Sequence, residues 1–314
     1  MVGAFPVSEP AACCAGVLVP TRARVSSTSA APSRNLGDVR ALEQIKQWPV
    51  RHAAAGVVTR AGQWSAGDAD RVFRLASVTK PLVAYAALVA VEEGAIELDQ
   101  PAGPPGSTVR HLLAHTSGVA FDTTDILARP GAKRIYSSAG FELLADFVAE
   151  HTGIPFPQYL REAVFEPLGM AASDLTGSAG HGAHSALADL MRFAAELLEP
   201  RLISAQTHAD ATTVQFPGSN GVLPGFGSQR PNDWGLGFEI RDGKSPHWTG
   251  TANSPRTYGH FGQSGTFIWV DPQLDLACVA LSDENFGDWS REVWPLFSDS
   301  VIGEATLARN TAAQ

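Results

Sequence analysis

The order of strand-like and helix-like segments predicts an α+β fold whose sheet is built from both ends of the chain. Strand patterns occur early and again after Trp234, whereas the middle of the chain is mostly helical. Strands and helices segregated in this way favour an α+β architecture over alternating parallel units. We therefore expect a sheet lobe from residues 35–82 and 234–304, with a helical lobe, residues 83–233, inserted between them.

The composition allows a large core and argues against polyanionic partners. Hydrophobic residues make up 44% of the 314 residues, and the formal net charge is −9. An acidic chain repels the phosphate backbone, so binding to nucleic acid is disfavoured. The chain also lacks a run of basic residues that would attract it to an anionic membrane. Cys13 and Cys14 are adjacent, and Cys278 lies in an apolar run. These three cysteines make neither a disulfide framework nor a metal site, and we expect no metal or other cofactor.

Both ends of the chain are expected to lie outside the folded domain. No apolar stretch approaches the roughly 18 residues needed to span a bilayer. The first ten residues contain no Lys or Arg, whereas a secretory signal begins with positive charge, so we expect no export signal and a cytoplasmic location. We expect a disordered tail at 1–34, one domain at 35–304 and a C-terminal tail at 305–314.

The elements expected before the helical lobe are a helix, two strands around a Gly-rich turn, and a second helix, at residues 37–48, 54–59, 71–75 and 81–94. Pro81 is acceptable because the first helical turn needs no backbone donor there. Residues 82–91 carry no charge on any face. A helix that is apolar all round is buried, so the residues just before it should lie at the mouth of a deeply seated helix.

The helical lobe and the second half of the sheet follow. Helices are expected at 139–152, 156–166 and 183–198, and an exposed loop at the Gly-, Pro-, Ser- and Asn-rich segment 216–233. Later strands are expected at residues 235–240, 257–261, 266–270 and 276–281. The last two strands should form a hairpin, and a final helix at 289–302 should be kinked or restarted at Pro295.

Ser77 and Lys80 form the first candidate for chemistry. Among four lysines, only Lys80 has a serine three residues earlier, and residues three apart on a helix share one face. The amine would then lie beside a hydroxyl that is too poor a nucleophile alone. The helix N-terminus would also favour a developing oxyanion. The alternative is a capping serine and a surface lysine, but a surface lysine fits poorly at the head of an uncharged helix.

Tyr136 is the second candidate, because it precedes Ser137, Ser138 and an expected helix and can project its hydroxyl into a cleft. A tyrosine pKa of about 10 makes a poor base at neutral pH. A neighbouring cation such as Lys80 would lower that pKa and let Tyr136 accept a proton. Taken alone, Tyr136 would be a packing residue and one of the serines a helix cap.

The third candidate is the run Gly259-His260-Phe261-Gly262, followed by Gln263, on an expected strand. Small residues on both sides of a histidine let a ligand approach the backbone closely. Taken alone, the same pattern fits a histidine that is satisfied within a strand and lies beside a Gly-rich turn. The three candidates therefore gain their weight from occurring together.

Together they resemble the serine β-lactamase and penicillin-binding protein superfamily. That superfamily has Ser-x-x-Lys early, Tyr-x-Asn in the middle and Lys-Thr-Gly or His-x-Gly on a late strand. The surrounding phrases match as well, including LASVTKPLVAYAAL, VRHLLAHTSG, YSSAGFELLADF and GHFGQSGTFIWVDP. The resemblance covers about residues 37–303 and is to class C β-lactamases, D-alanyl-D-alanine carboxypeptidases and family VIII esterases. It implies an antiparallel sheet flanked by helices.

The resemblance also implies a role for each residue. Ser77 would be the nucleophile that forms an acyl-enzyme. Lys80 and Tyr136 would share the general-base work, and Tyr136 would return the proton to the leaving group. The backbone N–H groups of Ser77 and Gln263 would form the oxyanion hole, and His260 would face a small-molecule substrate across the cleft. The oligomeric state is left open.

The remaining expected substrate contacts, Ser138, Phe261 and Gly262, include two departures from the family pattern. Ser138 stands where the family usually has Asn, and its hydroxyl has less reach towards a substrate amide. His260-Phe261-Gly262 stands where penicillin-binding enzymes commonly have Lys-Thr-Gly. A histidine charged only at mildly acidic pH and an apolar Phe offer less to a substrate carboxylate. We therefore expect a carboxylesterase for small esters, with β-lactamase or D-alanyl-D-alanine carboxypeptidase activity as the alternative.

Three other classes fit the sequence less well. An α/β-hydrolase needs Gly-x-Ser-x-Gly after a strand, and residues 262–266 fail at the last position. A zinc enzyme would use His111 and His115, but Leu112 occupies the place of the required glutamate. A non-catalytic penicillin sensor of the same fold would be acylated without turnover. The intact set of Ser, Lys and Tyr argues against a purely binding role.

Overall fold

The computed structural model describes residues 39–312, with side chains up to Leu307. The expectations for residues 1–34, including the Cys13–Cys14 pair, therefore lie outside the described residues. Within residues 39–312, none of the helices has the length and apolar character required to span a bilayer. The description below concerns this part of the chain.

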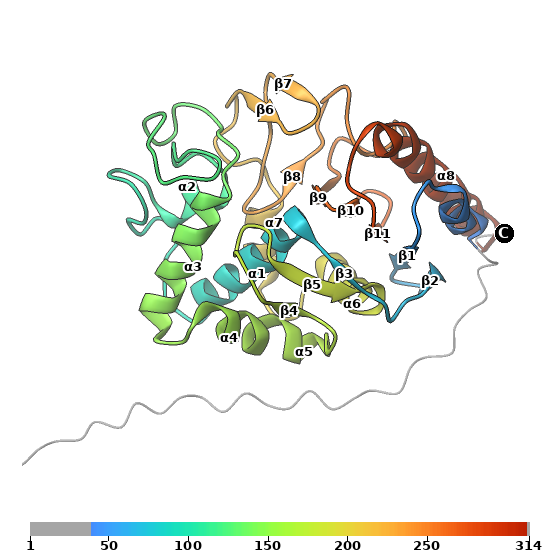
Figure 1. Ribbon diagram of the computed structural model, residues 1–314, viewed down its shortest axis with the longest axis horizontal. Helices are drawn as coiled ribbons and strands as arrows, with labels where there is room; N and C mark the ends of the chain where they lie inside the picture. The colour runs from blue at the N-terminus through green and yellow to red at the C-terminus, as the bar shows by residue number, and fades with distance from the viewer. Residues whose placement is uncertain (1–38, 313–314) are drawn as a thin grey trace, which may run out of the picture. The chain divides into compact units, whose positions relative to one another are not determined.

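A six-stranded sheet with antiparallel pairing forms the centre of the fold (Figure 1). Its strand order is β2-β1-β11-β10-β9-β8, and β1 pairs with β11 from Ala53↔Ser282 to Thr59↔Leu276. The expected sheet from early and late segments is thereby confirmed. The strands are Ala53–Thr59 (β1), Gly62–Gly67 (β2), Glu239–Ile240 (β8), Tyr258–Gly262 (β9), Thr266–Asp271 (β10) and Leu276–Ser282 (β11).

Side chains alternate between the two faces of this sheet and supply two separate cores. On one face, Val58 and Val279 pack in a cluster with helices α1 (Thr79–Glu92) and α6 (Leu187–Leu198). On the other face, Val57 and Cys278 pack with the 3₁₀-helix η1 (Arg40–Gln47) and α8 (Asp288–Ala312). Helix α1 is buried from Thr79 to Ala90, as its uncharged sequence predicts.

The inserted lobe is mostly helical, and two small sheets accompany it. One sheet, with the order β3-β5-β4, pairs a strand that precedes Ser77 with strands of the lobe, and the other is the hairpin β6-β7. The helices are Val109–Leu113 (α2), Ala139–Thr152 (α3), Phe156–Leu160 (α4), Arg161–Phe165 (η3), Glu166–Leu168 (α5) and Ala205–Ala211 (α7). The strands are Val72–Arg74 (β3), Asp174–Leu175 (β4), Ala183–Ala186 (β5), Gly221–Leu223 (β6) and Gly227–Gln229 (β7).

Four local expectations differ from the structure. Strand β3 pairs with β5 and not with the main sheet, because β2 occupies the edge of β1 as its hairpin partner. The helix expected at 183–198 begins only at Leu187, after β5. The segment 216–233 contains a hairpin with a buried Leu223, so it is not simply an exposed loop. Helix α8 continues past residue 304 to Ala312 and includes Pro295 in its interior.

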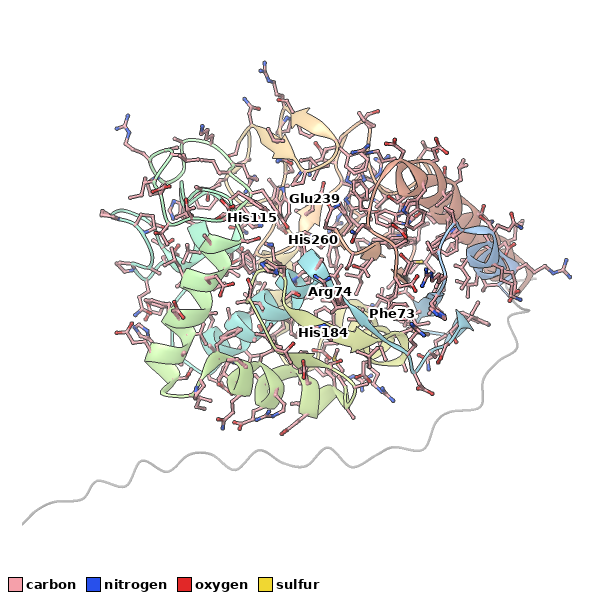
Figure 2. All side chains as sticks on the ribbon, in the orientation of Figure 1. Phe73, Arg74, His115, His184, Glu239 and His260 are labelled. Carbon is pink, nitrogen blue, oxygen red and sulfur yellow. The ribbon has the colours of Figure 1, made fainter. Side chains whose placement is uncertain are left out.

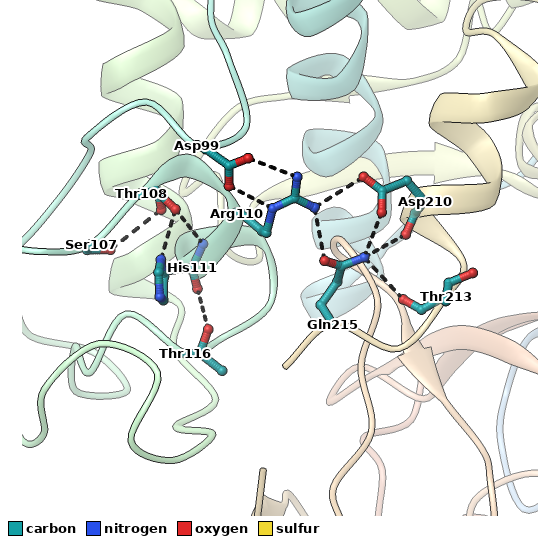
Figure 3. A network of polar contacts seen from close by, with 9 residues as sticks. All are labelled: Asp99, Ser107, Thr108, Arg110, His111, Thr116, Asp210, Thr213 and Gln215. Atoms are coloured by element: carbon teal, nitrogen blue, oxygen red, sulfur yellow. Dashed lines mark hydrogen bonds and ion pairs between the residues drawn. The ribbon is translucent and has the colours of Figure 1, made fainter. Parts of the chain in front are cut away.

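A polar network on α2 fixes the loop that follows this helix (Figure 3). Arg110 donates hydrogen bonds to the carboxylates of Asp99 and Asp210 and to the side-chain oxygen of Gln215. Gln215 in turn donates to Asp210. The network ties α2 to α7, and the loop after α2 is joined to the helix by a hydrogen bond from the Thr116 hydroxyl to the carbonyl oxygen of His111.

Candidate active site

Ser77 lies in a short 3₁₀-helix, η2 (Ala76–Val78), between β3 and α1. Ala76 has a φ of 45°, in the left-handed region that a residue with a side chain seldom adopts. Such strained positions cluster at functional sites, where the surrounding structure holds them in place. Here the Thr266 hydroxyl donates a 2.8 Å hydrogen bond to the carbonyl oxygen of Leu75. The strand β10 therefore fixes the turn that presents Ser77.

Lys80 is fully buried, one turn of chain after Ser77. Its Nζ lies 3.4 Å from Oγ of Ser77 and 3.1 Å from Oγ of Ser138. Nζ also donates a 2.8 Å hydrogen bond to the carbonyl oxygen of Gly180. Burial lowers the pKa of Lys80 to about 7, although the carboxylate of Glu142 works against this. Near neutral pH, much of Lys80 is therefore an uncharged amine that can accept a proton.

Tyr136 lies between Lys80 and the strand β9. Nζ of Lys80 is 4.6 Å from the centroid of the Tyr136 ring, and the Tyr136 hydroxyl is 3.3 Å from Nε2 of His260. Desolvation raises the pKa of Tyr136, while a hydrogen bond to Ser77 works against this. The expectation that Lys80 lowers this pKa is wrong, because desolvation dominates. Tyr136 is therefore a protonated phenol at neutral pH, so it holds a proton that it can give and cannot serve as a base in this state.

His260 is uncharged and oriented on β9. Its Nδ1 lies 2.7 Å from the carbonyl oxygen of Phe261, which can only accept, so Nδ1 carries the hydrogen. Nε2 is then free to accept the hydroxyl of Tyr136. Burial, followed by the charge of Lys80, lowers the pKa of His260 to about 3. The expectation of a charged His260 at mildly acidic pH is therefore wrong.

Gly262 brings β9 against the segment just before Ser77. A Cβ atom at Gly262 would lie 2.2 Å from the carbonyl oxygen of Leu75 and 2.5 Å from Oγ1 of Thr266. The sequence predicted that this glycine lets a ligand approach the backbone. The structure shows that the approaching group is the chain itself, and Gly262 is absent from the described residues that line the cavity below.

A cavity of about 320 Å³ opens beside Ser77. It brings together five residues that the sequence singled out: Ser77, Tyr136, His260, Phe261 and Gln263. Five further lining residues were missed, because no local motif marks them: Phe121, Leu223, Pro224, Trp234 and Glu239. Apolar side chains therefore form much of the wall. A second cavity of about 240 Å³ lies beside η1 and contains none of the candidate residues.

Ser138 is not among the described residues that line this cavity, and it contacts Lys80. Its Oγ accepts the hydrogen bond from Lys80. Its Cβ packs closely on Gly180, since a Cβ atom added to Gly180 would lie 2.8 Å from the Cβ of Ser138. Ser137 caps the helix instead: its Oγ accepts the N–H of Gly140 at 2.8 Å and donates to Ala120 at 2.6 Å. The two serines thus anchor the start of α3, with Ser138 directed at Lys80.

His115, which the sequence considered only as a weak metal ligand, holds both chain neighbours of Tyr136. Its carbonyl oxygen accepts the N–H of Ile135 at 2.8 Å, and its Nδ1 accepts the N–H of Ser137 at 3.2 Å. The rings of His115 and Tyr136 lie 4.6 Å apart. Its φ is 57°, which turns the chain sharply after α2. Figure 2 labels His115 together with His260 and Glu239 in the same region of the fold.

A hydroxyl beside a buried amine of lowered pKa, with a protonated phenol in the wall of the same cavity as the hydroxyl, is the arrangement expected of a serine hydrolase. The model of the Beta-lactamase family matches residues 43–300. The chain therefore belongs to the Beta-lactamase family, a family of serine hydrolases with the β-lactamase fold.

Solved structures agree with this assignment. The crystal structure of a β-lactamase from Mycobacterium bovis is 63% identical, with a TM-score of 0.84, covering 85% of this chain and 99% of that one. EstCE1, a hydrolase with promiscuous acyltransferase activity, is 18% identical with a TM-score of 0.71, covering 84% of this chain and 97% of that one. The latter likeness shows the fold alone.

Characterised relatives match over shorter stretches. The D-alanyl-D-alanine-carboxypeptidase/endopeptidase AmpH of Escherichia coli is 27% identical over 38% of this chain and 41% of its own length. Esterase EstB of Burkholderia gladioli is 32% identical over 32% of this chain and 38% of its own length. The chain thus matches less than half of the length of either relative.

Proposed function

We propose that the protein is a carboxylesterase that hydrolyses small esters through an acyl-enzyme on Ser77. The observation that carries the proposal is the 3.4 Å contact between Ser77 and a fully buried Lys80 whose pKa is lowered to about 7. A neutral amine at this distance can take the serine proton as the hydroxyl attacks. The likeness to esterase EstB over part of the chain supports the same class.

In the proposed acylation, Oγ of Ser77 attacks the ester carbonyl and its proton passes to the neutral amine of Lys80. The carbonyl oxygen takes the negative charge, which the N–H groups of Ser77 and Gln263 would stabilise. When the intermediate collapses, the bond to the alcohol breaks and the leaving oxygen takes the proton of the Tyr136 hydroxyl. The ammonium of Lys80 then returns a proton to Tyr136.

In the proposed deacylation, a water molecule attacks the acyl carbonyl and loses its proton to Lys80. The bond to Oγ of Ser77 breaks, and Oγ takes its proton back from the ammonium of Lys80 as the carboxylic acid leaves. Each residue therefore ends the cycle in the protonation state in which it began. His260 does not change its charge in this cycle and would orient the hydroxyl of Tyr136 through Nε2.

The lining of the cavity favours an ester over a β-lactam or a peptide. Both latter substrates present a carboxylate, and no Lys or Arg occurs among the ten described residues that line the cavity. His260 is uncharged, and Phe261 is apolar. A charge-assisted hydrogen bond, which contributes about 1.5–3 kcal/mol, is therefore missing for such a carboxylate. Esters also need less activation than amides.

The decisive comparison is kcat/KM for p-nitrophenyl butyrate against kcat/KM for a chromogenic cephalosporin. We expect the ester to be the better substrate, and intact-mass spectrometry should find the transient acyl group on Ser77. Ser77→Ala should lose at least about 10³-fold in ester turnover. Ser264→Ala is the matched control, because the Ser264 hydroxyl is occupied by the carbonyl oxygen of Arg74 at 2.7 Å.

Two alternatives make different predictions in the same assay. A β-lactamase, as the Mycobacterium bovis protein is named, would prefer the cephalosporin. A D-alanyl-D-alanine carboxypeptidase, as AmpH is named, would prefer a D-alanyl-D-alanine peptide. A penicillin sensor would accumulate acyl-enzyme and stop. Full activity in Ser77→Ala would refute all three, since each requires the same nucleophile.

We also propose that the protein acts in the cytoplasm on a small-molecule substrate. The small, largely apolar cavity beside Ser77 supports a small-molecule substrate. Cell fractionation tests the location directly. Recovery with the cytosolic marker is expected. Recovery of the protein outside the cell would contradict it.

A further inference from the structure

Glu239 is a buried carboxylate in the wall of the cavity beside Ser77. It lies on β8, the edge strand next to β9, and is only 2% exposed. It is the only Asp, Glu, Lys or Arg among the described residues that line the cavity. The sequence did not single it out, because an isolated glutamate in a short strand carries no motif.

Every oxygen of this carboxylate is held in place. Oε1 accepts a 2.9 Å hydrogen bond from Nζ of Lys244 and a 3.0 Å hydrogen bond from Nε2 of His247. Oε2 accepts a 2.6 Å hydrogen bond from Nε1 of Trp248. Lys244 lowers the pKa of Glu239 against the effect of burial, so the group is an anion at any pH at which the enzyme works.

The positive partner of this carboxylate, Lys244, does not line the cavity. Nζ of Lys244 donates its other hydrogen bonds to the carbonyl oxygens of Asp233, at 2.7 Å, and Ile240, at 2.6 Å. Its side chain is 1% exposed, and Lys244 is not a lining residue. Of the two charges, only that of Glu239 belongs to a residue that lines the cavity, and this charge works to raise the pKa of Tyr136 and of His260. Because Glu239 is itself buried, its charge is screened less than a charge on the surface.

We propose that Glu239 selects the charge of the substrate, favouring neutral or cationic esters and rejecting esters that carry an anionic group in the acyl chain. The inference rests on the proposed esterase function and names its substrate class. Rejection of a like charge is an effective route to specificity, because it acts on the unwanted substrate without weakening the wanted one. Uncharged His260 and apolar Phe261 provide no compensating cation on the same wall.

Three p-nitrophenyl esters of similar length provide the test: the neutral butyrate, the anionic hemiglutarate and the cationic 4-(trimethylammonio)butyrate. The three esters share a leaving group and react with the same nucleophile. A change in the reactivity of Ser77 or Lys80 therefore alters kcat/KM for all three alike and cancels in the ratio of one ester to another. In the unmodified protein we expect the anionic ester to be the poorest substrate, by at least about tenfold, which corresponds to about 1.4 kcal/mol. The cationic ester should equal or exceed the neutral one.

Glu239→Gln should raise the anionic-to-neutral ratio about tenfold. This variant leaves Lys244 buried without its counter-ion. The double variant E239Q/K244M, which removes both charges, is therefore measured as well. It should also raise the anionic-to-neutral ratio. Glu150→Gln, on the exposed side of α3, is the matched control and should leave the ratio unchanged. Melting temperatures establish that each variant is folded.

The outcomes separate this inference from the proposed function. If the neutral ester is turned over but the anionic ester is used equally well by the unmodified protein, the inference is wrong and the esterase function stands. An unchanged ratio in the folded double variant would also overturn it. If none of the three esters acylates Ser77, both the proposed function and the inference fail.

Discussion

Nζ of Lys80 donates a 2.8 Å hydrogen bond to the carbonyl oxygen of Gly180, a residue 100 positions later in the chain. A second hydrogen bond from Nζ reaches Oγ of Ser138. An uncharged amine has two N–H groups and one lone pair, so these two acceptors use both N–H groups. The lone pair then remains for the hydroxyl of Ser77. The loop that carries Gly180 therefore orients the base as well as burying it.

The first prediction concerns the pH dependence of ester hydrolysis. Since Lys80 must be uncharged to accept a proton, kcat/KM should fall as pH decreases through about 7, the pKa of Lys80. Glu142→Gln should move this midpoint to lower pH, because the negative charge of Glu142 raises that pKa. Asp146→Asn, on the exposed surface of the same helix, is the control. A midpoint that stays fixed in Glu142→Gln would contradict the assignment of Lys80.

The second prediction concerns His115 as a positioning residue for Tyr136. His115→Asn keeps an acceptor for the N–H of Ser137, and asparagine tolerates a positive φ. We expect it to retain most of the activity. His115→Phe keeps a ring but has no acceptor, and it should lower kcat by about 10- to 100-fold with little change in KM. Equal losses in the two variants, or a loss in KM alone, would show that the hydrogen bond to Ser137 is not what matters.

The third prediction concerns the contact between β9 and the turn that presents Ser77. Gly262→Ala would push a methyl group against the carbonyl oxygen of Leu75. It should cost about 1–3 kcal/mol in the free energy of unfolding and reduce kcat, because the turn must shift. Gly243→Ala is the control, since nothing lies within 4 Å of its Cβ position. Denaturant unfolding and ester kinetics on both variants provide the measurement, and normal kinetics in Gly262→Ala would contradict it.

The fourth prediction concerns substrate class. The double substitution Phe261→Thr with Ser138→Asn restores two family-like groups and should raise the ratio of cephalosporin to ester turnover. It should also destabilise the protein by about 3 kcal/mol, because Phe261 packs against Phe286 at 4.9 Å in the aromatic core. Phe267→Thr is the control: Phe267 is also buried but is not among the described residues that line the cavity, so this variant should lower stability without changing the ratio. A ratio that moves equally in both variants would count against the role of Phe261.

Several features of this protein follow from local sequence. Residues 82–91 have no charged face, so the helix must be buried, and Ser77 and Lys80 must share one side of its beginning. The β-rich runs after Trp234 pair as antiparallel neighbours, as their spacing predicts. These conclusions depend only on periodicity and on residues a few positions apart.

Other features were decided by tertiary structure. The partners of Lys80 include Gly180, and the cavity wall includes Glu239 and Phe121; none of these is marked by a local pattern. The signs of the pKa shifts also depend on burial: desolvation, which no sequence motif reports, lowers the pKa of Lys80 and keeps Tyr136 protonated. Nearby residue types thus determined which groups could react, whereas the packing of distant segments determined which of them carries the proton.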